Sequence, residues 1–319
     1  MIDLSVVVLS WNTRDLLVRC LETAEAEADR CASVGLGVRL VVVDNSSEDG
    51  SADVVAERFP DIHLIVNDAN RGYAPANNQG VAVHPQSEFV MTLNSDTEVR
   101  PGAFEILAGF LRDNPSYGAC GPRLLWPDGT TQPACMRFPR LATLFAYDTP
   151  LERLWPDNPW MRDYFCRDFD HEHDADVDQP PGACLCLRRE ALPDPCVAFD
   201  EQFWLYYNDV DLCRRLAKSG WKIRCLADAQ VVHHKGASTA SFPAMARELY
   251  MGRIRYYAKH YGPPGRLLAR AAARWRAGEE LRRLMRVHRH DDEVRQAAVA
   301  ELEGMLERVM VATETGTQE

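Results

Sequence analysis

The chain has 319 residues, 46% of them hydrophobic and 9% aromatic, and a formal net charge of −11. These values are typical of a globular protein, and the length allows one large domain or one domain with an appendage. No apolar stretch approaches the roughly 20 residues that span a bilayer, and the N-terminus shows no signal-peptide pattern. Ten scattered cysteines without a CxxC pair favour reduced thiols, so a cytoplasmic protein is expected.

The first hundred residues alternate between short apolar runs and amphipathic segments, which predicts a mostly parallel α/β sheet with right-handed connections. Strands are expected at residues 6–10, 40–44, 62–66 and 89–93. Helices are expected between them, at about 52–58 and around 77–83. Asn12 is expected to cap the first helix, and Pro101 to begin the helix after the fourth strand.

Beyond residue 120 the pattern is looser. Residues 126–130 indicate a hairpin turn, residues 183–187 a strand, and Gly220 the end of a helix. Residues 148–181 are expected to form a long loop or lid. His171 and His173 lie there among five acids, but an exposed mobile loop is a better interpretation than a metal site, because nothing fixes a coordination geometry.

Three of the predicted strands end in polar residues: Ser10, Asp44 and the run Asn94-Ser95-Asp96. In an open parallel sheet, ligands bind beyond the carboxyl ends of the strands. Asp96 is therefore well placed to hold a divalent cation against a diphosphate. Structural roles are the alternative: Asp96 would cap a local turn, and Asp44 would begin the polar turn that follows it.

Two common nucleotide-binding folds are excluded by their missing motifs. The first turn, residues 10–14, contains no glycine, whereas a dehydrogenase needs G-x-G-x-x-G at this place. A P-loop enzyme needs a glycine-rich loop that ends in lysine, and no such loop occurs. A diphosphate would therefore be held by a metal ion and side chains.

Eight motifs resemble, in order and spacing, those of inverting family-2 glycosyltransferases of the GT-A fold. They are Val8–Asn12, Val43–Gly50, Asn70–Tyr73 with Asn77–Gly80, Asn94–Thr97, Gly182-Ala183, Phe199–Glu201, Asn208–Leu212 and Val232–Thr239. The resemblance implies a GT-A catalytic domain over residues 1–240, with a Rossmann-like, mostly parallel sheet, and a C-terminal helical region over 241–319. Residues 127–129 and 233–239 are most similar to bacterial rhamnosyltransferases that act on polyprenyl-diphospho-sugars.

The resemblance assigns the donor-binding residues. Ser10, Asn12 and Asp44 would line the base and ribose, with Asp44 accepting a hydrogen bond from the pyrimidine N3–H. Arg71 and Asn78 would border the nucleotide. The nucleotide-sugar site is completed by the residues at the family's D-x-D motif, which are Asn94, Ser95 and Asp96.

The resemblance also assigns the metal and the base. Asp96 would bind Mg²⁺ or Mn²⁺, and His233 would be either a second ligand or an ordinary polar residue. Asp209 matches the general base, although Asn208 replaces the usual glutamate. That replacement removes a carboxylate whose repulsion would raise the pKa of the base. Asp211 is expected to be a structural acid at the start of a helix.

The implied reaction is inverting transfer of a sugar from a nucleoside-diphosphate donor to a hydroxyl of a saccharide acceptor. L-rhamnose from dTDP-rhamnose is the first choice of donor, with UDP-sugars as the alternative. A polyprenyl-linked acceptor is expected, in cell-envelope or polysaccharide synthesis. Two alternatives remain open: transfer to a soluble small molecule or protein, and a non-catalytic nucleotide-sugar-binding partner.

Charge is distributed unevenly along the chain. Residues 245–290 contain twelve Lys/Arg and three Glu, a net of +9, so the remainder carries −20. That acidic remainder would repel nucleic acid. The basic segment is expected either to pair with acids of the catalytic domain or to lie on anionic lipid at the inner face of the membrane. The acidic helix predicted at 291–311 would pair back onto it or form a homodimer.

Overall fold

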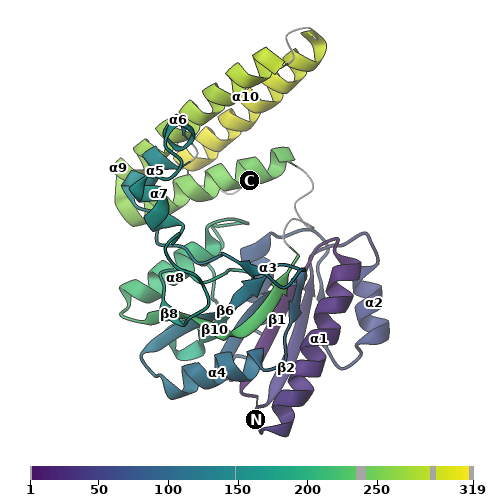
Figure 1. The fold of residues 1–319 in the computed structure, drawn as a ribbon. Helices are drawn as coiled ribbons and strands as arrows, with labels where there is room; N and C mark the ends of the chain where they lie inside the picture. Colours follow the sequence, from purple (N-terminus) through teal and green to yellow (C-terminus); the bar gives the residue numbers. More distant parts are fainter. Residues whose placement is uncertain (1, 148, 235–241, 288–291, 316–319) are drawn as a thin grey trace. The chain divides into compact units, whose positions relative to one another are not determined.

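Figure 1 shows the computed structural model of the chain, which describes residues 2–147, 149–234, 242–287 and 292–315. It separates into two compact units. Unit 1 comprises Met1–Phe138, Phe165–Glu201 and Asn208–Ala240, and unit 2 comprises Pro139–Tyr164, Gln202–Tyr207 and Ser241–Glu319. The prediction of two continuous domains did not anticipate the two earlier segments of unit 2.

Unit 1 is built on a ten-stranded sheet in the order β3-β2-β1-β4-β9-β6-β10-β5, with β7 beside β6 and β8 beside β10. The strands are β1 (Leu4–Ser10), β2 (Val38–Asp44), β3 (His63–Val66), β4 (Phe89–Asn94), β5 (Thr97–Val99), β6 (Tyr117–Leu125), β7 (Thr131–Gln132), β8 (Ala175–Asp176), β9 (Cys184–Arg188) and β10 (Lys222–His233). Strands β3, β2, β1 and β4 are parallel neighbours, as are β6 and β10. The antiparallel strand β9 separates these two groups.

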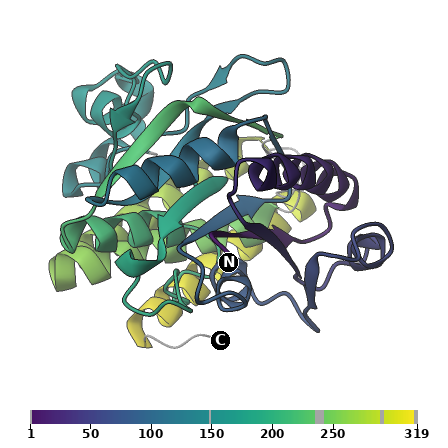
Figure 2. The same cartoon turned by 90° about the horizontal axis from the view of Figure 1, so that it is seen from below.

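Helices cover both faces of this sheet, as the two views show (Figures 1 and 2). They are α1 (Arg14–Ser33), α2 (Ser51–Arg58), α3 (Tyr73–Val81), α4 (Ala103–Asp113) and α8 (Asn208–Lys218). Side chains of α1, α2 and α4 form one core with the sheet, and side chains of α3 and α8 form the other. Strands β1, β2 and β4 are mostly apolar and almost entirely buried, as expected of strands that are covered on both faces.

The turn after β1 differs from the prediction that Asn12 caps α1. Asn12 has a φ of 52°, a left-handed conformation that asparagine tolerates better than most residues, and Thr13 occupies the N-cap position. The Asn12 Oδ1 atom instead accepts a hydrogen bond from Glu48 N at 2.8 Å. The side chain thus joins the loop after β1 to the loop after β2.

The expected long loop at 148–181 contains secondary structure, and one of its histidines is not exposed. His171 is only 3% exposed; its Nε2 accepts from Cys135 N at 3.2 Å, and its Nδ1 lies 3.0 Å from Phe169 O. The exposed-loop prediction is therefore wrong for His171, which fastens residues 169–171 to residue 135. It is correct for His173, whose exposed ring pairs with Asp170.

The regular secondary structure in the described residues of unit 2 is helical. It contains α5 (Leu141–Ala146), α6 (Pro150–Leu154), α7 (Pro159–Tyr164), α9 (Phe242–Val287) and α10 (Asp292–Thr315). Helix α9 is interrupted at Gly262, with φ 69° and ψ −161°, just before the two prolines that predicted this break. Tyr257 donates to Arg140 O at 2.8 Å and Tyr261 to Pro139 O at 2.9 Å, so α9 holds the segment that precedes α5.

Helix α10 packs against α9, which is one of the two arrangements predicted for the acidic helix. Buried alanines of α9 (Ala269, Ala273 and Ala277) leave room for close approach, and Val309 of α10 is fully buried. Self-association through α10 stays a prediction. Within the described residues, no helix combines the length and the apolar character that crossing a bilayer requires. The ten cysteines all lie in the described residues, and none forms a disulfide.

Candidate active site

The sheet register brings the three polar strand ends together. Ser10 of β1 is paired with Asp44 of β2, and Leu9 with Asn94 of β4. A chain of buried hydroxyls then ties the loops: Ser10 Oγ lies 3.1 Å from Thr13 Oγ1, which lies 2.8 Å from Ser95 Oγ. Thr13 had no predicted role; its hydroxyl fixes the two loops relative to each other.

Asp44 combines a structural contact with an open oxygen. Its Oδ1 accepts from Ser47 N at 2.9 Å, which is the turn-forming role weighed from the sequence. Its Oδ2 is buried and has no hydrogen-bond partner. A buried carboxylate oxygen without a donor is costly, so this atom suits a donor group that arrives with a ligand.

The loop of residues 70–73 is bound to the end of β2 through Asn45. Arg71 N donates to Asn45 Oδ1 at 3.0 Å, and Asn45 Nδ2 donates to Asn70 Oδ1 at 2.8 Å. The Arg71 guanidinium itself is half exposed and pairs with Asp68 at 3.1 Å. Its contact with a nucleotide stays a prediction.

Asn78 is occupied by contacts within the protein. Its Nδ2 donates to Phe199 O at 2.9 Å and to Glu201 Oε1 at 3.0 Å. Its Oδ1 accepts from Ala198 N at 3.1 Å and Phe199 N at 3.0 Å. These four bonds use the whole capacity of the amide, so Asn78 fastens the loop of residues 198–201 to α3. Its predicted place beside the nucleotide is untested.

Asp96 and His233, the two predicted metal ligands, lie together. Both side chains are largely buried, and His233 Nε2 is 3.5 Å from Asp96 Oδ1. His233 Nδ1 lies 2.7 Å from Gln132 Oε1, whose amide nitrogen donates back to His233 O at 3.3 Å. Because an amide oxygen only accepts, Nδ1 carries the proton, and the lone pair of the neutral ring is on Nε2.

This donor set fits a divalent cation that is completed by a substrate. Mg²⁺ and Mn²⁺ accept carboxylate oxygens, and Mg²⁺ in particular is often held by one or two protein groups plus phosphates and water. In the described residues, no cluster of three or more His, Cys, Asp and Glu side chains could hold a metal ion by itself. The hydrogen bond from His233 Nδ1 to Gln132 resembles the outer-shell hydrogen bonds that orient metal-binding histidines.

Asp209 lies in the first turn of α8, against the backbone of Gly182. Burial raises the pKa of the Asp209 carboxyl above its ordinary range. Asp211, two residues further along α8, is fully buried and pairs with Arg215 at 2.8 Å. The structure therefore gives Asp211 the structural contact that was predicted for it, and leaves Asp209 as the acid near the strand ends.

Tyr73 joins the two sides of the site, a role that the sequence did not suggest. Its hydroxyl donates to Asn94 Oδ1 at 3.2 Å and lies 3.4 Å from Gly182 O. Burial raises the pKa of the Tyr73 hydroxyl, and the neighbouring Asp209 carboxylate raises it further. The phenol therefore stays protonated between the metal-side residue Asn94 and the base-side residue Gly182.

Comparisons with known proteins show the family of this chain. Residues 5–176 match the sequence profile of Glycosyl transferase family 2. This chain belongs to that family. The N-acetylglucosaminyl-diphospho-decaprenol L-rhamnosyltransferase of Mycobacterium tuberculosis is 31% identical over 251 residues, which cover 76% of this chain and 79% of the relative. The O-antigen biosynthesis protein RfbC of Myxococcus xanthus is 30% identical over 71% of this chain and 17% of its own length.

Solved structures confirm the predicted GT-A fold of this glycosyltransferase. Mannosyltransferase PcManGT from Pyrobaculum calidifontis, in complex with GDP-Man and Mn²⁺, has a TM-score of 0.51 at 16% identity, over 99% of this chain and 88% of that one. GalNAc-T7 with UDP, GalNAc and Mn²⁺ has a TM-score of 0.53 at 12% identity, over 85% of this chain and 55% of that one.

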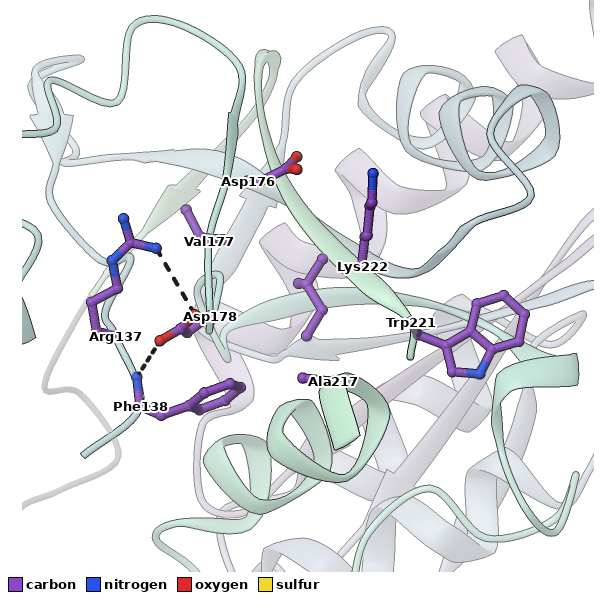
Figure 3. Close-up of a pocket in the computed structure, with 9 residues that line it drawn as sticks. Arg137, Phe138, Asp176, Val177, Asp178, Ala217, Trp221 and Lys222 are labelled. Atoms are coloured by element: carbon purple, nitrogen blue, oxygen red, sulfur yellow. Dashed lines mark hydrogen bonds and ion pairs between the residues drawn. The ribbon is translucent and has the colours of Figure 1, made fainter. Parts of the chain in front are cut away.

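A surface pocket of the glycosyltransferase lies at the amino end of β10, whose other end is at the candidate site (Figure 3). Lys222, which lines it, begins β10, whereas His233 ends that strand at the candidate site. Asp178, one of the two acids that line the pocket, already has partners within the protein: it accepts from Phe138 N at 2.8 Å and pairs with Arg137 at 3.9 Å. These contacts stabilise the loop before β9, and none of the predicted site residues lines this pocket.

Proposed function

We propose that this glycosyltransferase moves L-rhamnose, with inversion, from dTDP-rhamnose to a hydroxyl of an N-acetylglucosaminyl-diphospho-polyprenol. The observation that carries the proposal is the bridge formed by Tyr73, which links the end of β4 beside Asp96 to the backbone against Asp209. The metal-side acid Asp96 and the base-side acid Asp209 are both close enough to Tyr73 for their charges to raise the pKa of its hydroxyl. The name of the Mycobacterium tuberculosis relative supports the choice of donor sugar and acceptor.

Asp209 is the general base in this mechanism. The acceptor hydroxyl attacks the anomeric carbon from the side opposite the departing diphosphate, and the Asp209 carboxylate takes its proton. Its raised pKa strengthens it as a base. Base catalysis of this kind contributes about 10²–10⁴-fold in rate, and holding donor and acceptor together supplies much of the remainder.

Asp96 and His233 would hold a divalent cation, which neutralises charge on the leaving diphosphate when it is bound. Asp44 Oδ2, buried and without a partner, suits the N3–H donor of a pyrimidine. Ser10, Thr13 and Ser95 keep these two contacts at a fixed separation through their hydroxyl chain. In this arrangement the pyrimidine is bound at the end of β2 and the diphosphate just beyond the end of β4.

Donor turnover by the purified chain tests the proposal. It would be incubated with dTDP-rhamnose or UDP-sugars, Mg²⁺ or Mn²⁺, and a short-chain N-acetylglucosaminyl-diphospho-lipid, with released nucleotide and glycosylated lipid both measured. The proposal expects dTDP release that depends on the acceptor, together with a rhamnosylated lipid. Nucleotide binding without release would indicate the non-catalytic alternative, and product only with soluble saccharides would indicate the soluble-acceptor alternative.

The proposed acceptor gives one face of α9 a use as a membrane contact. Leu267, Trp275 and Met285 are 67%, 45% and 58% exposed. They fall on one helical stripe with Arg274 and Arg286, which are also exposed. Apolar side chains between arginines suit the surface of an anionic bilayer, where each basic residue contributes about 1 kcal/mol.

The stripe is narrower than the whole basic segment suggested. Tyr256 and Tyr257, counted from the sequence among its apolar members, are buried inside unit 2. Arg270 is buried as well, and Arg282 pairs with Glu279. Arg282 and Arg283 thus pair with glutamates of the basic segment itself, and pairing with acids of the catalytic domain stays a prediction. A mutational test should therefore change Arg274, Trp275 and Arg286.

Vesicle co-sedimentation tests the membrane contact. The intact chain should pellet with vesicles that contain anionic lipid and stay in solution with neutral ones. Combined Arg274→Glu, Trp275→Ser and Arg286→Glu should abolish pelleting, whereas Arg39→Glu with Arg58→Glu, which changes net charge equally on unit 1, should not. Equal recovery in solution with both kinds of vesicle would contradict the contact.

A further inference from the structure

We propose that Arg123 is a diphosphate-binding residue of this glycosyltransferase. It lies near the carboxyl end of β6 and is half-buried. Its Nε is shielded from solvent without a hydrogen-bond partner. Among the described residues, no carboxylate pairs with it and no ring stacks against it. On the flanking strands, Arg188 donates to Tyr117 O and Arg224 pairs with Asp176 through its terminal nitrogen, although Arg224 Nε also lacks a hydrogen-bond partner.

The alternation of β6 determines which face of the sheet carries Arg123. Cys120 and Leu124 belong to the core beneath α1 and α4, and Ala119 belongs to the core beneath α3 and α8. Because alternate residues of a strand share a face, Arg123 lies on the face of Ala119. This is the face that carries α8, and therefore Asp209.

Two close backbone contacts connect this face to the base. A Cβ at Gly121 would lie 2.7 Å from Pro180 Cβ, and a Cβ at Gly182 would lie 2.3 Å from Asp209 Oδ2. The segment of residues 180–182 thus runs from β6 to Asp209. Arg123 is two residues beyond Gly121 in the direction of the carboxyl ends of the strands, which is the direction of the candidate active site.

The sheet is irregular at this position. In the pairing of β10 with β6, Leu226 faces Pro122, but the next pair is Gln230 with Arg123, so residues 227–229 form a bulge. The bulge is held in place by Asp174, whose Oδ1 accepts from Ala227 N at 2.9 Å. Bulges are common beside active sites, where they redirect a side chain. Here the bulge is directly beside Arg123.

The chemistry of Arg123 selects the ligand. A guanidinium that is partly removed from water without an acceptor is unfavourable, so its position is best explained by a partner that arrives with substrate. Its planar fork of donors matches phosphate oxygens in pairs. The donor supplies one diphosphate. If the proposed function is correct, the lipid-linked acceptor supplies a second diphosphate. Arg123 lies on the same face of the sheet as Asp209, the general base that deprotonates the acceptor hydroxyl.

Binding of inorganic pyrophosphate and of dTDP to the intact chain, measured by calorimetry, tests the residue without requiring turnover. Arg123→Met should weaken binding of at least one diphosphate by about ten- to a hundredfold, as expected for a lost charge-assisted hydrogen bond, and Arg123→Lys should retain part of the affinity. Arg39→Met, at an exposed strand position on β2, is the matched control.

The source of the diphosphate follows from which affinity changes. A weaker dTDP affinity assigns Arg123 to the donor. An unchanged dTDP affinity, with a higher KM for a diphosphate-linked acceptor but not for the same saccharide on a neutral alkyl chain, assigns it to the acceptor. The pyrophosphate and dTDP measurements remain valid even if rhamnosyl transfer is not observed, so the two proposals fail separately.

Thermal unfolding separates binding from a structural role. Without ligand, Arg123→Met should unfold at the same or a higher temperature than the native chain, because a buried unpaired donor is removed. A lower unfolding temperature combined with diphosphate affinities and acceptor KM values that match those of Arg39→Met would overturn the proposal, since Arg123 would then only support the sheet.

Discussion

Gly182 lies so close to Asp209 that a Cβ at position 182 would be 2.3 Å from Asp209 Oδ2. Only glycine fits there without moving the carboxylate. Gly182→Ala should therefore lower kcat by about ten- to a hundredfold through misplacement of the base, while the affinity for dTDP stays unchanged. Gly109→Ala, where a Cβ meets nothing within 4 Å, should leave both values unchanged. Native kcat in Gly182→Ala would contradict the assignment of Asp209.

Asp209→Asn keeps the size of the side chain but removes the proton acceptor. Turnover should fall at least about a hundredfold, with donor affinity preserved, in steady-state and binding measurements. Asp211→Asn is the matched control. Because Asp211 is buried against Arg215, this variant should lower the unfolding temperature while kcat changes little. If both variants were fully folded and Asp211→Asn lowered kcat more than Asp209→Asn, the base would be Asp211.

The raised pKa of Asp209 predicts opposite effects of pH on activity and stability. The base works only when ionised, so kcat/KM should fall as pH drops through the raised pKa, at a higher pH than an ordinary carboxyl would give. Above that pKa the folded state carries a charge that burial disfavours. Asp209→Asn should therefore unfold at a higher temperature than the native chain near neutral pH.

The stability difference should disappear in acid. Below the ordinary carboxyl pKa of about 4, Asp209 is protonated in both the folded and the unfolded chain, so the advantage of the asparagine variant vanishes. Unfolding temperatures measured at a series of pH values provide the check. An advantage that persists unchanged at low pH would mean that it does not come from ionisation of Asp209.

Asp96→Ala should abolish transfer and weaken donor binding, because the diphosphate loses the cation that would neutralise it. EDTA should have the same effect on the native chain, with recovery on addition of Mn²⁺ or Mg²⁺. Donor binding by calorimetry, with and without the metal, measures both. Full activity in EDTA would exclude the metal from the mechanism.

Gln132 should tune the metal affinity without contacting the ion. Gln132→Met removes the acceptor that fixes the tautomer of His233, and loss of such a contact typically costs about 10- to 100-fold in metal affinity. The metal concentration for half-maximal activity should rise by that factor, while kcat at saturating metal changes little. An unchanged metal requirement would make the bond between Gln132 and His233 purely structural.

The sequence was sufficient for the parallel strands of the first hundred residues, for β9 and for the polar residues at the strand ends, whereas β6 and β10 were not predicted. Apolar runs and turn residues are local signals, so β1, β2 and β4 ended near the predicted positions, with Ser10, Asp44 and Asp96 at or just beyond their ends. The break in α9 was equally readable, because glycine and proline act within a few residues. Family membership followed from motif order, which also depends only on the linear chain.

Tertiary structure decided what those signals could not contain. The bond between Gln132 and His233 joins residues 101 apart, and Tyr73 and Gly182 are 109 apart. His171 was expected to be exposed, but it is buried and its ring contacts the backbone of residues 134–135, which are distant in the sequence. Hydrophobic periodicity determines which elements form, whereas contacts between distant segments depend on how those elements pack. The strand ends could therefore be predicted from the sequence, whereas the contact partners of Asp209 and His233 could not.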